Sequence, residues 1–223
     1  VTHVAAVESL EGEVIPALET LRDTLDEKSD IFEDIIKVGR THLMDATPIT
    51  FGQEFSAYVA QIENGLKSIN NALDLLKEVP IGGTAVGTGL NTQKGFDAKV
   101  CSVLSDKTGY DFEPAYNKFS LLAGKEGIVE AHGAITTAAT ALQKLATDVR
   151  WMSSGPRCGL QEIDIPANEP GSSIMPGKIN PTQAEAVTMV CTQIMGNNTT
   201  VTQAAANGNF QLNVNKPLLA HNL

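Results

Sequence analysis

Apolar positions along the chain recur mostly at intervals of three and four residues, the spacing of one face of an α-helix. The clearest stripe predicts a helix over residues 52–78, and all of its positions are apolar: Phe55, Val59, Ile62, Leu66, Ile69, Leu73 and Leu76. A second stripe predicts a long helix over residues 1–38. Pro16 should bend or split that helix, because proline lacks the backbone N–H that a helix interior needs.

Three further helices are expected over residues 95–107, 119–154 and 182–206, with Gly109 ending the first of them. The breaks between stripes predict a connecting loop at 39–51 and a loop dense in glycine and proline at 155–181. A loop of that length in a compact domain is usually functional or disordered. With no strand-rich region, the expected fold class is all-α, a bundle of long helices whose near-heptad stripes form seams against other subunits.

Composition narrows the class of protein. The 223 residues carry a net charge of −10, so nucleic acid and anionic membrane surfaces are poor partners. No apolar stretch reaches the roughly 18 residues of a membrane span. Three isolated cysteines argue against a disulfide framework and favour a reducing compartment, so we expect a cytoplasmic protein.

Familiar cofactor motifs are missing. The four histidines are far apart and neither HExxH nor CxxC occurs, so no metal is expected. The glycine-rich stretch 82–89 lacks the lysine of a phosphate-binding P-loop and follows a predicted helix, not a strand. We therefore interpret it as a tight turn between helices.

The strongest chemical candidate is the segment 171–185, which packs glycine, two serines, lysine and asparagine together just before a predicted helix. The Lys178 ammonium, the Asn180 amide and the free N–H groups at the helix start could hold a carboxylate or phosphate. A flexible surface loop with a solvated lysine is the alternative. A second candidate is the loop at 39–48, where Thr41 and His42 lie between two long helices; a lone histidine is otherwise more often structural.

These two segments carry a family resemblance. Gly-Ser-Ser-Ile-Met-Pro-Gly-Lys-Ile-Asn-Pro at 171–181 resembles the signature loop of the fumarase/aspartase superfamily, whose members eliminate a group β to a carboxylate. Gly-Arg-Thr-His-Leu-Met-Asp-Ala-Thr-Pro at 39–48, with His42 where aspartases usually carry glutamine, narrows the resemblance to the class II fumarase branch, as does Pro-Thr-Gln-Ala-Glu-Ala at 181–186. Met44 and Ala184 depart from the usual residues, at positions that the chemistry does not need.

The resemblance implies reversible hydration of fumarate to (S)-malate and assigns roles. Ser172 is the implied base, His42 the group that handles water, and Glu185 its orienting partner. The implied substrate ligands are Thr41, Ser173, Lys178, Ile179 and Asn180. It further implies a homotetramer in which three subunits share each active site, with no metal or cofactor and with a small dicarboxylate as substrate.

The same resemblance predicts that residues 1–223 are the central helical domain of a longer subunit. On this interpretation the N-terminal substrate-binding segments and a small C-terminal domain are absent, a mitochondrial leader would lie upstream in a eukaryote, and the isolated piece is inactive. Aspartate ammonia-lyase or another lyase of the superfamily is the alternative function. A third hypothesis is a non-catalytic structural protein, since some relatives of these lyases serve as lens proteins. The intact set of candidate residues argues against this third hypothesis.

Overall fold

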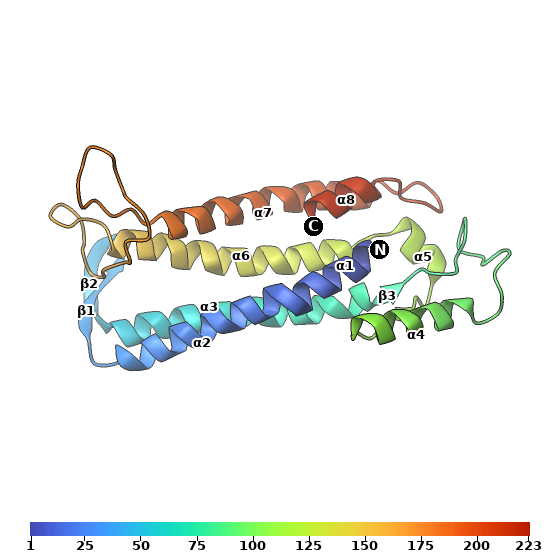
Figure 1. The fold of residues 1–223 in the computed structure, drawn as a ribbon, viewed down its shortest axis with the longest axis horizontal. Helices are drawn as coiled ribbons and strands as arrows, with labels where there is room; N and C mark the ends of the chain where they lie inside the picture. Colours follow the sequence, from blue (N-terminus) through green and yellow to red (C-terminus); the bar gives the residue numbers. More distant parts are fainter.

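The computed structural model describes all 223 residues and shows an elongated bundle in which long helices run side by side (Figure 1). The elements along the chain are α1 (Thr2–Ser9), the π-helical turn η1 (Leu10–Val14), α2 (Ile15–Ile31), β1 (Ile36–Thr41), β2 (Met44–Thr50), α3 (Phe51–Lys77), β3 (Glu78–Val79), α4 (Phe96–Thr108), β4 (Glu113–Pro114), α5 (Lys118–Ala123), α6 (Glu126–Met152), α7 (Thr182–Ala206) and α8 (Lys216–Asn222). The predicted all-α bundle is confirmed.

Helix α3 is the centre of the core, and it packs against α2 on one side and α6 on the other. It begins with a capping box, in which the Thr50 side chain accepts from the Gln53 N–H and the Gln53 side chain accepts from the Thr50 N–H. Its predicted apolar stripe faces inward, with Ile62, Ile69 and Leu76 at most 2% exposed. At 27 residues the helix is about 40 Å long, which sets the length of the bundle.

The first helical stretch is divided just before the proline, one of the two predicted outcomes, but it ends earlier than predicted. A π-helical turn separates α1 from α2 and brings Pro16 into the first turn of α2, where its missing N–H costs least. The helix stops at Ile31, because Phe32 leaves the helical conformation. The prediction of a helix to residue 38 is therefore wrong.

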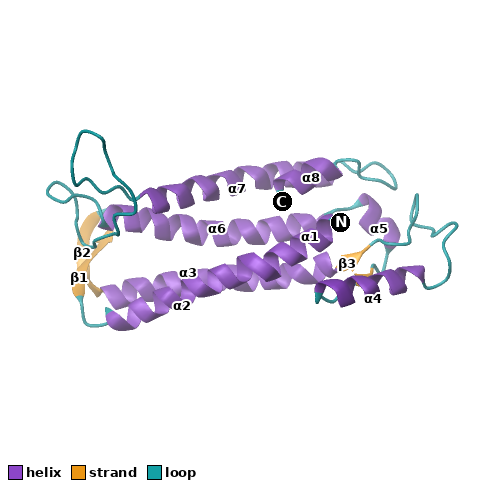
Figure 2. Ribbon diagram, viewed as in Figure 1, coloured by secondary structure: helices purple, strands orange, loops and turns teal.

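The predicted loop at 39–51 is also wrong, since residues 36–50 form an antiparallel β-hairpin at one end of the bundle (Figure 2). Gly39 allows the two strands to approach closely, because a Cβ there would lie 2.7 Å from the Thr47 carbonyl oxygen. The hairpin escapes a pattern search because its strands are short and neither of them has an alternating buried face.

Two other boundaries differ from the sequence prediction. The helix expected over 119–154 is broken between α5 and α6, where Gly124 is extended and the Lys125 ammonium donates to the carbonyls of Leu121 and Leu122 that the break leaves free. The short C-terminal α8 was not predicted. By contrast, α7 has the predicted bounds, Gly109 follows α4 with a φ of +80°, and residues 155–181 contain neither helix nor strand.

No helix of the bundle combines the length and the apolar character of a membrane-spanning segment.

Candidate functional site

The sequence-predicted site residues gather at one end of the bundle, where the β1–β2 hairpin and the long loop before α7 lie (Figure 1). Thr41 and His42 come from the hairpin. Ser172, Ser173, Lys178, Ile179 and Asn180 come from the loop, and Glu185 comes from the first turn of α7. The fold therefore brings both candidate segments to the same end.

His42 lies in the tight turn of the hairpin. Thr41 pairs with Met44, so His42 and Leu43 are the two turn residues, and both have positive φ values, 56° and 62°. Positive φ at both turn residues is the requirement of a type I′ turn, which normally takes Asn-Gly. A left-handed conformation costs a non-glycine residue roughly 1–2 kcal/mol. Such strain persists only where the surroundings impose it and often marks a functional position.

The loop at 171–180 closes on itself through three polar contacts. The Gly171 N–H donates to the Lys178 carbonyl at 3.1 Å, and the Asn180 side-chain amide donates to the Gly171 carbonyl at 2.8 Å. The Lys178 N–H donates to the Met175 carbonyl at 3.3 Å. The closure requires glycine at position 171, because a Cβ there would lie 2.1 Å from the Lys178 carbonyl oxygen.

Within this closed loop, the Ser172 hydroxyl oxygen accepts hydrogen bonds from the backbone N–H groups of Ile174 and Met175, both at 3.3 Å. Two N–H dipoles pointing at one oxygen stabilise negative charge on it. Ser172 is partly exposed, while Ser173, Lys178 and Ile179 are exposed on the outside of the loop. The arrangement suits a serine that must lose its proton to act.

Lys178, Ile179, Asn180 and Glu185 line a cleft of about 390 Å³ between the loop and the C-terminal end of α6. Arg150, which sequence analysis did not single out, lies there too, with Nη2 3.8 Å from Oε1 of Glu185. Both side chains are more than two-fifths exposed, so this pair contributes little to stability. The cleft offers two cations and an amide to an anionic ligand.

Thr41 and His42 line a second cleft, of about 860 Å³, on the hairpin side of α6. Trp151 lines both clefts. One chain therefore does not bring His42 together with Glu185 or Lys178; their clefts are separate.

Four charged residues, two on β1 and two packed against it, were missed by sequence analysis. The Lys37 ammonium contacts the carboxylates of Glu54 and Glu162, and the Arg40 guanidinium donates to Glu162 at 2.8 Å. Burial alone would raise the pKa of Glu162, but the hydrogen bonds from Lys37 and Arg40 outweigh it and hold that pKa below its ordinary value. Glu162 is 122 residues from Arg40, and no local pattern signals such a contact.

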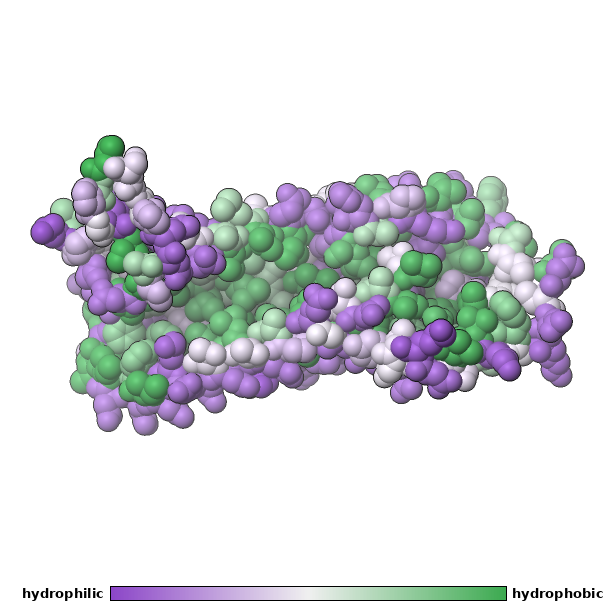
Figure 3. Space-filling model, in the orientation of Figure 1, coloured by the Kyte–Doolittle hydropathy of each residue, from purple (hydrophilic) through white to green (hydrophobic).

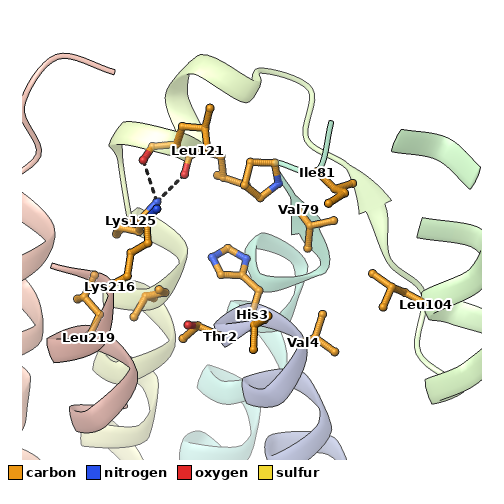
Figure 4. Close-up of a pocket in the computed structure, with 14 residues that line it drawn as sticks. Thr2, His3, Val4, Val79, Ile81, Leu104, Leu121, Lys125, Lys216 and Leu219 are labelled. Carbon is orange, nitrogen blue, oxygen red and sulfur yellow. Dashed lines mark hydrogen bonds between the residues drawn. The ribbon is translucent and has the colours of Figure 1, made fainter. Parts of the chain in front are cut away.

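A third cavity, of about 280 Å³, lies at the opposite end of the bundle and contains none of the predicted site residues (Figure 4). Its walls are mainly apolar, and Thr2, His3, Lys125 and Lys216 are its polar lining residues. Nδ1 of His3 lies 3.0 Å from the Glu78 carbonyl oxygen, and burial lowers the pKa of His3. Burial likewise lowers the pKa of Lys125.

Comparison with known proteins adds independent evidence. Residues 1–196 match the protein family described as Lyase. The chain is 58% identical over 99% of its length to a mitochondrial fumarate hydratase from Rhizopus oryzae, of which it covers 45%, and 55% identical over 99% of its length to a class II fumarate hydratase from Neisseria meningitidis, of which it covers 48%. It thus spans about half the length of the curated relatives that it matches.

Solved structures agree with the sequence matches. A class II fumarase from Schistosoma mansoni superimposes on 99% of the chain with a TM-score of 0.95 at 46% identity, and 49% of that protein is covered. A fumarate lyase:delta crystallin from Brucella melitensis superimposes on 99% of the chain with a TM-score of 0.86 at 38% identity, and 50% of that protein is covered.

Proposed function

The chain belongs to the Lyase family, and from that premise we propose that the whole protein is a fumarate hydratase, which adds water reversibly to fumarate to give (S)-malate. Support comes from identities of 53–58% to fumarate hydratases over essentially the whole chain. The structural observation that carries the proposal is the closed loop in which the Ser172 oxygen accepts two backbone hydrogen bonds.

In the direction of elimination, a base must take a weakly acidic proton from the malate carbon that lies next to a carboxylate. A serine hydroxyl is a poor base in water, but the N–H groups of Ile174 and Met175 would stabilise its alkoxide. We assign Ser172 this role. The electron pair of the broken C–H bond moves into the neighbouring carboxylate, giving an aci-carboxylate that needs nearby positive charge.

The exposed Lys178 ammonium is positioned to supply that charge, since its cleft also contains the Asn180 amide. We assign both residues to the substrate carboxylates, with the Ile179 backbone and the hydroxyls of Thr41 and Ser173 as further donors. The charge of Lys178 would stabilise the aci-carboxylate more than the ground state, because negative charge is concentrated there as the reaction proceeds.

The intermediate collapses when the C–O bond breaks and the departing hydroxyl takes a proton on the opposite face, leaving fumarate and water. His42 is the group that we assign to this proton, and Glu185 would fix the imidazole tautomer by accepting from one ring nitrogen. His42 and Glu185 line separate clefts of one chain, so on this proposal they meet when subunits associate.

Association of subunits also fits the surface of the bundle. In the space-filling view, apolar residues follow the middle of the visible face while hydrophilic residues follow its edges (Figure 3). Helix α7 exposes Val187, Met189 and Val190 at 37%, 66% and 58%. Large exposed apolar areas are typical of interfaces. We propose a homotetramer in which three subunits build each active site and this chain is the central helical part of a subunit.

The proposed compartment is the cytoplasm, with the mitochondrion as the alternative, since the relatives of similar identity include both bacterial and mitochondrial proteins. The product and substrate would place the protein in the tricarboxylic acid cycle.

The test offers the full-length protein malate and aspartate in separate assays. We expect a rise in fumarate absorbance with malate and no ammonia with aspartate; ammonia release without malate turnover would assign the protein to aspartate ammonia-lyase instead. Ser172→Ala should lower kcat by about 100- to 10,000-fold, the usual loss for a general base. Ser102→Ala removes an equally small hydroxyl from the exposed face of α4 and should keep wild-type turnover. Near-native activity of Ser172→Ala would exclude its role.

A further inference from the structure

The charged cluster along β1, formed by Lys37, Arg40 and Glu162, joins segments that are distant in sequence. The side chains of Lys37 and Glu162 are 6% and 13% exposed, and that of Arg40 is 20% exposed. Each carboxylate oxygen of Glu162 faces one cation, with Oε2 at 2.9 Å from the Lys37 ammonium and Oε1 at 2.8 Å from the Arg40 guanidinium. Charge-assisted contacts with so little solvent are among the stronger polar interactions in a protein.

The backbone of Glu162 is itself fixed to the bundle. Its N–H donates to the Met152 carbonyl at 2.7 Å, and the N–H of the preceding Gln161 donates to the Ser154 carbonyl at 2.8 Å. The segment therefore folds back on the C-terminal end of α6, where helix carbonyls lack partners within the helix. Glu162 thus connects a rigid helix to the first strand of the hairpin.

Both cations come from β1, three residues apart. In a regular strand, residues three apart point to opposite faces, and the irregular pairing between Val38 and Arg40 relieves that constraint. Arg40 is only two residues from His42. The Glu162 carboxylate therefore acts on the strand directly before the turn.

Little else holds the tip of the hairpin. Leu43 and Met44 are 64% and 70% exposed, so apolar packing does not fix the turn. Yet His42 and Leu43 keep left-handed backbone conformations that must be imposed by their surroundings. Besides the hydrogen-bonded ladder to β2, the contacts available for that purpose are the ion pairs of Lys37 and Arg40. Lys37 contacts Glu54 and Glu162, while Arg40 contacts Glu162 and, at 4.0 Å, the exposed Asp45. Glu162 is the carboxylate that contacts both cations.

We propose that Glu162 is a positioning residue, which clamps Lys37 and Arg40 and thereby holds His42 in the orientation needed for proton transfer. The assignment rests on the proposed hydratase function for its effect on catalysis. Glu162 does not touch the substrate in this scheme; it acts through the hairpin.

The test compares Glu162→Gln with Asp164→Asn in the full-length protein. Both changes remove one carboxylate charge from the same segment, but Asp164 is exposed and contacts only the side chain of Gln161. Glu162→Gln should lower kcat by about 10- to 100-fold, because a displacement near 1 Å costs about that much. KM should change less than kcat, since the clamp acts on His42 and, of the residues assigned to carboxylate binding, on Thr41 alone. Asp164→Asn should match wild type in both.

Hydrogen exchange supplies a readout that does not depend on turnover. In Glu162→Gln the amides of residues 41–44 should exchange at least about tenfold faster, while those in the middle of α3 and α6 keep their protection. A double-mutant cycle with Lys37→Met should be non-additive, with the double variant no slower than the slower single variant. If Glu162→Gln does not assemble, Arg40→Lys replaces the guanidinium that contacts Glu162 at 2.8 Å and the exposed Asp45 at 4.0 Å, and it should likewise lower kcat.

The outcomes separate the two proposals. A wild-type protein without fumarate or malate turnover refutes the hydratase function, and the exchange of residues 41–44 then still tests the clamp. If the wild type is active and Glu162→Gln keeps both its kcat and the hydrogen-exchange protection of residues 41–44, the clamp alone is overturned. A uniform loss of protection throughout α3 and α6 would also overturn it, because Glu162 would then serve general stability.

Discussion

Replacing Gly171 with alanine is the sharpest test of the closed serine loop. The backbone of Gly171 does not require glycine for its φ value, so the substitution introduces a steric conflict and nothing else. A Cβ at this position would lie 2.1 Å from the Lys178 carbonyl oxygen and 2.7 Å from its carbonyl carbon. Both are backbone atoms, so no side-chain rotation can relieve the contact.

The size of the effect follows from that distance. Real Cβ contacts begin near 3.0 Å, so Gly171 and Lys178 must separate by about 0.9 Å. The bond from the Gly171 N–H to the Lys178 carbonyl would be lost, which costs about 1 kcal/mol. Since Ser172 and Lys178 both move, we expect kcat to fall roughly 100-fold, which equals about 2.7 kcal/mol of transition-state stabilisation.

The assay is malate dehydration by the full-length protein, followed through fumarate absorbance, together with thermal unfolding. Gly171→Ala should lose turnover while its free energy of unfolding changes by about 1 kcal/mol or less, because the loop lies on the surface. Gly133→Ala is the control: nothing lies within 4 Å of a Cβ at that position in α6, so turnover should persist. Wild-type kcat in Gly171→Ala would refute the reasoning, since the loop closure would then have no part in catalysis.

Two further predictions concern proton equilibria. Glu185→Gln should lower kcat and shift the pH–rate profile if this carboxylate orients His42, and an unchanged profile would count against the pairing. Burial lowers the pKa of His3 in the folded protein, so the unfolded chain binds the proton more readily. Its contribution to stability is therefore complete above about pH 6.5 and declines as the pH falls through the folded-state pKa. In urea unfolding, the free energy of unfolding of the wild type should be lower at pH 5.5 than at pH 7.5, and His3→Gln should reduce this difference. An equal difference in wild type and His3→Gln would contradict the prediction.

The helices that sequence patterns predicted well are those with long, uninterrupted apolar stripes. Helix α3 contains seven apolar positions at helical spacing, and α7 begins directly after Pro181, a residue that cannot sit inside a helix. Both signals are local, which is why the bounds could be predicted. The hairpin was missed because its two strands show no alternation, and partly exposed short strands are stabilised by pairing that lies outside any local window.

The residues of the candidate site also divide into those with a local sequence signal and those without one. The segments with Ser172 and His42 could be identified because each is a compact group of reactive residues in a loop-like context. Glu162 could not, because its significance depends on Lys37, which is 125 residues away in sequence. Its immediate neighbours in sequence, Gln161 and Ile163, form no pattern that signals the contact. A residue that acts by positioning another is visible only once the chain has folded.

The positions of Ser172 and His42 also bear on how the reaction could be completed. Anti elimination requires a base and an acid on opposite faces of one small substrate, so the two groups must lie within a few ångströms of it. In this chain His42 is exposed at the tip of a hairpin, and Ser172 lies in a protruding loop rather than in an enclosed cavity. Both belong to segments fixed by polar contacts, the ion pair of Arg40 on β1 and the Gly171 closure, while His42 is exposed and Ser172 is partly exposed. Groups arranged like this are prepared to meet partners supplied by other surfaces, which is the arrangement that a shared active site between subunits demands.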